Sequence, residues 1–164
     1  SNMANIHKSL IAAKNKCDDL IYFVEDDYIH SEDTFSEMII TYERLSSQLG
    51  RELILCPADY PYLYTKIEPS NIFLGANKHW RKVEETLCTF CTSKILLNKH
   101  WDKFVSMCQF EHYPFEQPLH DIYKLEYCLS PIPSLAIHCT NINSIFGLSP
   151  NVDWKKVWED NKDY

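Results

Sequence analysis

The sequence predicts a single α/β domain, and three observations support this. The chain has 164 residues, which is enough to bury one core. It is 45% hydrophobic and 13% aromatic, values typical of a folded chain rather than a disordered one. Stretches with apolar residues at helical spacing alternate with short apolar runs, an order typical of a sheet with helical crossovers. We therefore expect one domain over residues 1–164.

The first half of the chain shows this alternation most clearly. Residues 5–17 carry apolar side chains at helical spacing and predict a helix. The continuous apolar run over residues 20–24, LIYFV, predicts a strand buried on both faces, as in a parallel sheet. A second helix is expected to begin at Thr34 and end at Gly50, with Glu37 completing a capping box.

The second half has shorter and less regular patterns. The Ser1-Asn2 pair before Met3 is typical of a tag remnant, and residues 159–164 are expected to fray. The expected elements are, in order, a strand from Glu52 ended by Pro57 and Pro61, a loop with a short strand over 62–80, a strand over 85–97 that leads into a helix over 98–109, a helix after Pro118, a short strand over 134–140 and a helix after Asp153.

Composition excludes several functional classes. The 16 Lys+Arg against 23 Asp+Glu give a formal charge of -7, which argues against a nucleic-acid partner. Only three glycines occur, so there is no Gly-rich phosphate loop. No apolar run reaches the roughly 18 residues of a membrane span, and no signal peptide is visible. The seven cysteines, an odd number, favour a reduced and cytoplasmic setting.

Three acids, Glu25, Asp26 and Asp27, directly follow the predicted strand over 20–24. Ligands of open α/β sheets bind at the carboxyl ends of strands, and neighbouring like charges repel unless a cation lies between them. In extended backbone Glu25 and Asp27 point to one side, where they would share Mg²⁺ or Mn²⁺. Asp26 points to the other side, toward a ribose or an ordered water. The alternative is a solvated acidic turn before the next helix.

The segment DDLIYFVEDDYIHSEDTFSEM, residues 18–38, resembles the central segment of GT-A-fold glycosyltransferases, close to the family 2 type. In that family a strand ends in a D-x-D-type motif that holds a divalent metal and a nucleotide-sugar diphosphate. Residues 25–27 take the place of this motif, with Glu at its first position. Residues 56–64, 79–97 and 120–141 resemble later parts of the family. The resemblance covers most of residues 5–158 and implies a GT-A-like mixed sheet flanked by helices.

The resemblance also implies an activity. It is the metal-dependent, inverting transfer of a sugar from a nucleotide-sugar donor to a hydroxyl of a sugar, lipid-linked or protein acceptor. Asp121, with Glu116 as substitute, would be the general base, and His138 would complete the metal shell. The alternatives are a helix N-terminal acid for Asp121 and a hydrogen-bonded histidine for His138. Such a domain normally begins with a βαβ half that binds the nucleotide, and residues before Asn5 do not supply it. The resemblance therefore predicts the C-terminal part of a longer transferase.

Four further residues are candidates for contact with substrate. Trp80 would stack on a sugar and Arg81 would pair with a phosphate, while Asp59 and Tyr60 follow a predicted strand end. The alternative is a packed tryptophan beside a surface arginine.

Two rival functions remain open. A metal-dependent hydrolase using the same acids would release phosphate from simple esters without a sugar acceptor. A non-catalytic domain that binds a partner or a glycan would fold without metal and would not bind a nucleotide.

Overall fold

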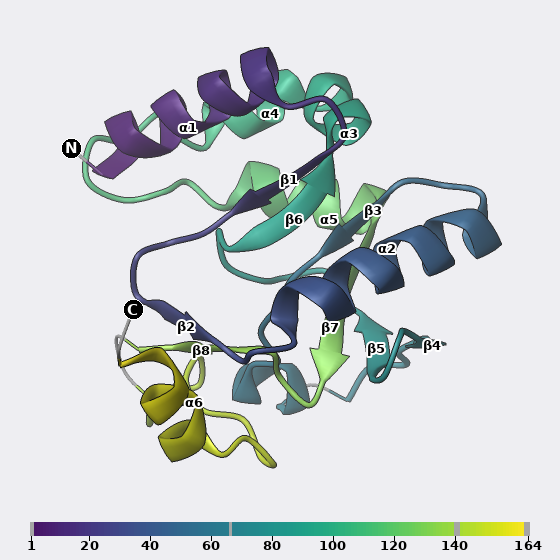
Figure 1. Cartoon of the computed structure of the whole chain (residues 1–164). Helices are drawn as coiled ribbons and strands as arrows, with labels where there is room; N and C mark the ends of the chain where they lie inside the picture. The colour runs from purple at the N-terminus through teal and green to yellow at the C-terminus, as the bar shows by residue number, and fades with distance from the viewer. Residues whose placement is uncertain (1, 66, 140–141, 163–164) are drawn as a thin grey trace.

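The structure is a computed structural model, which describes residues 2–65, 67–139 and 142–162. It contains helices on both sides of a sheet (Figure 1). The elements are, in chain order, α1 (Asn2–Lys16), β1 (Leu20–Phe23), β2 (Tyr28–His30), α2 (Thr34–Leu49), β3 (Leu53–Leu55), the 3₁₀ helix η1 (Pro61–Tyr64), β4 (Ile72–Leu74), β5 (His79–Lys82), β6 (Phe90–Ser93), α3 (Lys94–Lys99), α4 (Trp101–Ser106), α5 (Gln117–Leu125), β7 (Tyr127–Ile132), β8 (Ala136–His138) and α6 (Trp154–Asn161).

Six strands form a mixed sheet in the order β1-β6-β3-β7-β5-β4, and β2 pairs with β8 separately. Helix α2 covers one face, where Met38, Tyr42 and Leu45 form a core with Trp80. Helices α1, α3, α4 and α5 cover the other face and share a second core (Figure 1). The prediction of an α/β domain with a mixed sheet flanked by helices is therefore confirmed.

Strands β1, β3 and β7 run in the same direction. β1 and β3 are each antiparallel to β6, and β3 is parallel to β7. Their carboxyl ends consequently meet at one edge of the sheet, the edge at which ligands bind in open α/β sheets. The acids of residues 25–27 follow β1 at this edge.

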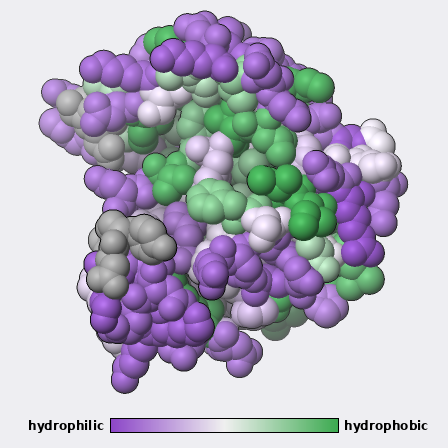
Figure 2. Space-filling view, in the orientation of Figure 1, coloured by the Kyte–Doolittle hydropathy of each residue, from purple (hydrophilic) through white to green (hydrophobic). Residues whose placement is uncertain are grey.

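Strand β1 differs from the prediction in one respect. It pairs only with β6, in antiparallel orientation, and lies at the edge of the sheet. Ile21 is its one buried residue, so the expectation of burial on both faces is wrong. Val24 is 48% exposed, and on the neighbouring helix α2 the apolar residues Phe35 and Ile39 are 56% and 48% exposed. Figure 2 shows hydrophobic residues gathered across the middle of the face on which β1 and α2 lie.

The central strand β7 was not expected from the sequence. Residues 127–132 lie between β3 and β5, although the sequence pattern extended the helix after Pro118 toward them. Pro131 obscures the strand pattern, because proline removes a donor from the hydrogen-bond ladder. Helix α5 begins one residue before Pro118, which occupies the first turn, where no N–H is needed.

Glu37 of α2 does not form the expected capping box. The N-cap residue is Asp33, and its side chain makes no cap hydrogen bond. Glu37 is instead 1% exposed, and its carboxylate points at the β4–β5 turn. The other end of α2 is as predicted, because Gly50 ends the helix in the left-handed conformation with φ of 62°.

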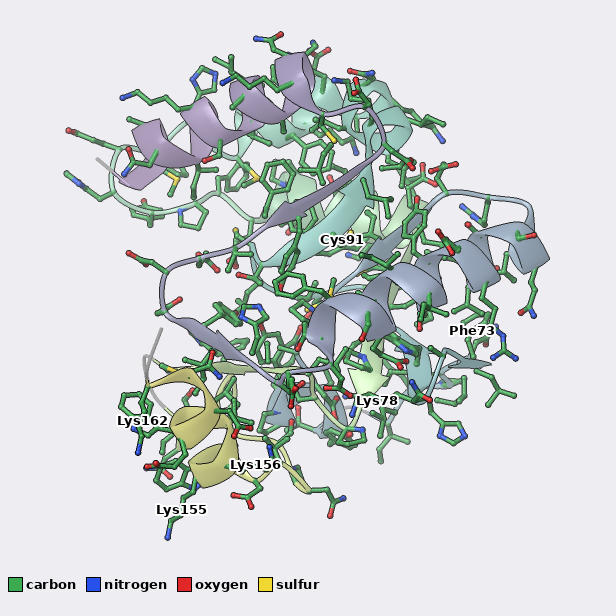
Figure 3. All side chains as sticks on the ribbon, viewed as in Figure 1. Phe73, Lys78, Cys91, Lys155, Lys156 and Lys162 are labelled. Atoms are coloured by element: carbon green, nitrogen blue, oxygen red, sulfur yellow. The ribbon has the colours of Figure 1, made fainter. Side chains whose placement is uncertain are left out.

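The carboxylate of Glu37 accepts four hydrogen bonds. Its donors are the amides of Asn77 (2.8 Å) and Lys78 (3.2 Å), the indole Nε1 of Trp80 (3.1 Å) and the hydroxyl of Thr41 (3.1 Å). Lys78, labelled in Figure 3, marks this turn beside α2. Glu37 therefore joins helix α2 to the outer hairpin of the sheet.

The carboxylate of Glu126, after α5, joins three basic side chains. Lys99 Nζ and His100 Nε2 lie 2.7 Å from Oε1, and Arg51 Nη2 lies 3.1 Å from Oε2. Burial alone raises the pKa of Glu126, but hydrogen bonds from Lys99, His100 and Arg51 outweigh burial and lower it from 4.5 to about 2. Because the folded-state pKa is below the unfolded one, this stabilisation is complete above the unfolded pKa and is lost as the pH falls through the folded one.

We expect acidification from about pH 6 to about pH 3 to remove on the order of 2 kcal/mol of unfolding free energy through this one residue. The figure is smaller than the full shift implies because pH 3 is still above the folded-state pKa of about 2, so only part of the stabilisation has been lost. Urea unfolding at both pH values checks this: Glu126→Gln should flatten the pH dependence, and Glu111→Gln, at an exposed site, should leave it unchanged. Equal slopes in both variants would show that Glu126 is not responsible.

The C-terminal helix is as predicted. Asp153 is the N-cap of α6, and its side chain accepts a hydrogen bond from the Lys156 amide at 3.1 Å. The helix continues to Asn161, whose amide donates to the carbonyl of His30 at 2.9 Å and so ties α6 to β2. Of the residues expected to fray, 163 and 164 lie outside the described residues. No helix in the described part of the chain is both long and apolar enough to cross a bilayer.

Candidate functional site

The two-stranded ribbon of β2 and β8 brings the acidic motif and His138 together. Tyr28 lies opposite His138 in the antiparallel register, and the amide of Cys139 donates to the carbonyl of Asp27 at 2.7 Å. Asp27 therefore lies beside the end of β8, with its Oδ2 at 2.9 Å from Nε2 of His138. The ring of Tyr28 stacks on the imidazole at 4.9 Å between centroids. This pairing fixes the side chain of His138.

Glu25, the first acid of the motif, contacts Thr89. Its amide donates to the hydroxyl of Thr89 at 3.1 Å, and this hydroxyl is 3.5 Å from the Glu25 carboxylate. Burial raises the pKa of Glu25 from 4.5 to about 7; the charges of Asp27 and Glu116 add to the rise, and His138 opposes it. Glu25, Asp27 and His138 are thus close enough to interact electrostatically, whereas Asp26 is exposed.

The acidic motif opens on a cleft of about 510 Å³ between α1 and the end of β1. This volume lies within the range of small-molecule sites, roughly 300–1,000 Å³. Residues 25–27 form its charged wall. Its other lining residues come from α1, β1, β6 and the loops around them, and they include Asn5, Ser9, Leu10, Phe90 and Met107. The cleft thus combines carboxylates with an apolar floor.

The two candidates for a general base lie in different environments. Glu116 precedes α5, and burial raises its pKa, with His120 opposing the rise. Its charge also raises the pKa of Glu25, which places it near the acidic motif. Asp121 is 46% exposed, accepts a hydrogen bond from Gln117 at 3.0 Å and lies 3.8 Å from Lys103 Nζ. Of the two candidates, Glu116 is the one whose charge affects the pKa of Glu25.

The expected metal ligands were Glu25, Asp27 and His138. Within residues 2–65, 67–139 and 142–162, no three His, Cys, Asp or Glu side chains form a closed ligand set. Asp27 and His138 nevertheless present an oxygen and a nitrogen 2.9 Å apart. Two ligands at about 2.1 Å and at right angles around an octahedral cation are about 3 Å apart. The same 2.9 Å is the hydrogen bond between Nε2 and Oδ2, so His138 is a hydrogen-bonded histidine in this structure, and a cation would have to replace that bond to bind both atoms.

The four candidates for substrate contact occupy mostly buried positions. Trp80 is 0% exposed and bonds to Glu37, so no sugar ring can reach it, and this expectation is corrected. Neighbouring residues of a strand point to opposite faces, so Arg81 lies on the other side of β5, where it pairs with buried Asp59. Tyr60 is 1% exposed, and its hydroxyl is 2.5 Å from that of Tyr28.

Sequence reasoning missed three residues of this region. Tyr28 and Thr89 position His138 and Glu25, and Tyr64 contacts the Asp59–Arg81 pair. Tyr28 follows the acidic motif directly, and the apolar pair Tyr28-Ile29 is a local signal for a strand there. Thr89 carries no local signal, because its contact with Glu25 joins positions 64 residues apart. Tyr64 contacts Asp59 only five residues away, but no spacing rule of a loop indicates that contact.

A scan against protein-family models, a search of curated proteins and a search of solved structures each found no match to this chain.

Proposed function

We propose that the chain is the catalytic part of a metal-dependent glycosyltransferase that uses a nucleotide-sugar donor. The observation that carries this proposal is the Asp27–His138 pair at the carboxyl edge of the sheet, with Glu25 beside it and a cleft in front of it. A carboxylate that lines a cleft and contacts an imidazole favours a cation shared with a phosphate-bearing ligand.

Asp27 and His138 would hold Mn²⁺ or Mg²⁺, and Glu25 would be a further ligand or a nearby negative charge. The bound cation would offset the charge that develops on the departing diphosphate. Mn²⁺ suits this site better than Mg²⁺, because one ligand is an imidazole nitrogen. Tyr28 and the β2–β8 register keep the imidazole beside Asp27, where a cation would replace the hydrogen bond between the two side chains.

Glu116 would remove the proton from the acceptor hydroxyl while that oxygen attacks the anomeric carbon, as an inverting reaction requires. Burial raises the pKa of Glu116 above its ordinary value, and a more basic carboxylate is a better proton acceptor. Glu116 also lies close enough to Glu25 to affect its pKa, whereas Asp121 is exposed beside Lys103. The proposed base is therefore Glu116.

The metal role is tested by a calorimetric titration of the chain with Mn²⁺ in the presence of pyrophosphate. We expect Asp27→Asn and His138→Gln each to weaken Mn²⁺ binding at least about tenfold, because each removes a ligand. The matched control is Asp26→Asn, an exposed neighbour that should bind Mn²⁺ as the unchanged chain does. Equal binding by the Asp26 and Asp27 variants would contradict the metal site.

The transfer reaction is tested separately by following release of nucleoside diphosphate from a panel of nucleotide-sugars with Mn²⁺. We expect Glu116→Gln to slow this release and Asp121→Asn to leave it unchanged. Mn²⁺-dependent phosphate release from p-nitrophenyl phosphate, without any turnover of nucleotide-sugars, would identify a hydrolase and overturn the proposal.

A further inference from the structure

A second cleft, of about 670 Å³, lies beside η1 and β5. The lining residues on which the argument depends are Tyr62 and Tyr64 of η1, Arg81 and Lys82 of β5, Lys124 of α5 and Tyr127 of β7. None of them lines the cleft at the acidic motif. The cleft is large enough for a small ligand.

The ring of Tyr64 is held in a fixed position in this cleft. The guanidinium of Arg81 lies over the ring, 4.2 Å from its centroid, and the Tyr64 hydroxyl donates to Oδ2 of Asp59 at 2.5 Å. The residue is still 53% exposed. One face of the ring is thus covered by Arg81, and the exposed part of the ring is available as a flat apolar surface.

The groups that hold Tyr64 are themselves buried. Asp59 and Arg81 form an ion pair in which the side chains are 2% and 9% exposed. The Nε of Arg81 is buried and has no hydrogen-bond partner among the described residues. Burying two charges costs desolvation free energy, and replacing such a pair with apolar residues is often neutral or stabilising. The pair is therefore better explained by the ring that it positions than by stability alone.

The charges around the cleft indicate what kind of ligand it suits. Among the described lining residues, three are cationic (Arg81, Lys82 and Lys124) and three are acidic (Glu68, Glu84 and Glu85). A phosphate site would show an excess of cations. A balanced set of donors and acceptors around an exposed aromatic ring suits an uncharged ligand with many hydroxyl groups and one apolar face, and a pyranose ring has this chemistry.

We propose that this cleft binds a saccharide whose ring stacks on the exposed face of Tyr64. Tyr62 packs at 6.0 Å on buried Tyr60, whose hydroxyl bonds to Tyr28 of the acidic site, so the cleft and that site are separated by a few side chains of the core. In the proposed transferase the saccharide would be the part of the acceptor distant from the reacting hydroxyl. Only this identification as acceptor rests on the proposed function; binding itself does not.

The test is an NMR titration of the chain labelled in its tyrosine rings, with maltotriose, cellotriose and chitotriose added separately at millimolar concentrations. We expect at least one sugar to shift the Tyr64 ring signal. In the variants, binding is followed by the ring signals of Tyr62 and Tyr127, which also line the cleft. Tyr64→Ala should weaken binding at least about tenfold, and Tyr64→Trp should retain it. The matched control is Tyr113→Ala, which removes another exposed tyrosine ring that lies outside the cleft.

Three results would overturn the proposal: no sugar shifts the Tyr64 signal, the Tyr113 variant loses as much binding as the Tyr64 variant, or inorganic phosphate shifts the signal when no sugar does.

Asp27→Asn separates this inference from the metal site. That variant is expected to lose Mn²⁺ binding and keep the sugar-induced shift. A sugar shift without any Mn²⁺ binding by the unchanged chain would support the saccharide cleft and contradict the proposed function.

Discussion

Replacing Glu37 by alanine is expected to lower the free energy of unfolding by about 3–5 kcal/mol. The carboxylate of Glu37 accepts hydrogen bonds from two backbone amides, the Trp80 indole and the Thr41 hydroxyl, in a position that is 1% exposed. Alanine leaves these buried donors without an acceptor and opens a cavity beneath α2. Urea unfolding measures the loss.

Two further variants make the Glu37 result specific. Glu37→Gln keeps one acceptor oxygen and turns a donor toward the Asn77 amide, so we expect a smaller loss of about 1–2 kcal/mol. Glu43→Ala removes an exposed glutamate from the same helix and should change stability by less than about 0.5 kcal/mol. If Glu37→Ala and Glu43→Ala have equal stability, the hydrogen-bond cluster does not hold the hairpin.

Replacing Arg81 by methionine is expected to destabilise the chain by about 3–5 kcal/mol, because it leaves the carboxylate of Asp59 buried without its partner. Burial raises the pKa of Asp59, while the Tyr64 hydrogen bond and Arg81 lower it, so loss of Arg81 removes part of what favours the charged form. Thermal or urea unfolding of the variant checks the loss.

The double variant Asp59→Leu/Arg81→Met is expected to recover most of this stability, because two apolar side chains replace the two buried charges. The control on the same strand is Lys82→Met. It breaks a 3.5 Å pair with exposed Glu84 and should cost less than about 1 kcal/mol. A double variant as unstable as Arg81→Met would refute the desolvation argument. A stable double variant that no longer binds a saccharide would assign the ion pair a role in holding Tyr64.

Local patterns predicted the helices better than the strands. Helices α2 and α6 were correctly located because each carries its own signal, Gly50 at the end of one and Asp153 at the start of the other. The sheet depends on partners that are remote in the sequence. The apolar run of β1 indicated a central strand, yet β1 lies at the edge, and Pro131 concealed the strand that is central.

The candidate site was predicted as far as residue types and order allow. The motif of residues 25–27 and His138, at the end of a short strand, were both predicted as parts of one site. The structure brings Asp27 and His138 into contact. The choice between Glu116 and Asp121 depends on which carboxylate faces the motif, and that depends on the packing of α5. Glu37 matched a capping box at the sequence level because spacing alone cannot show which way a side chain turns.

The contact between Asp27 and His138 joins positions 111 residues apart, through a ribbon of three residues in each strand. The six-stranded sheet does not include this ribbon, so the contact depends on the pairing of β2 with β8 alone. A substitution that disrupts this short ladder is therefore expected to separate the acid from the imidazole while the hydrogen bonds of the large sheet remain.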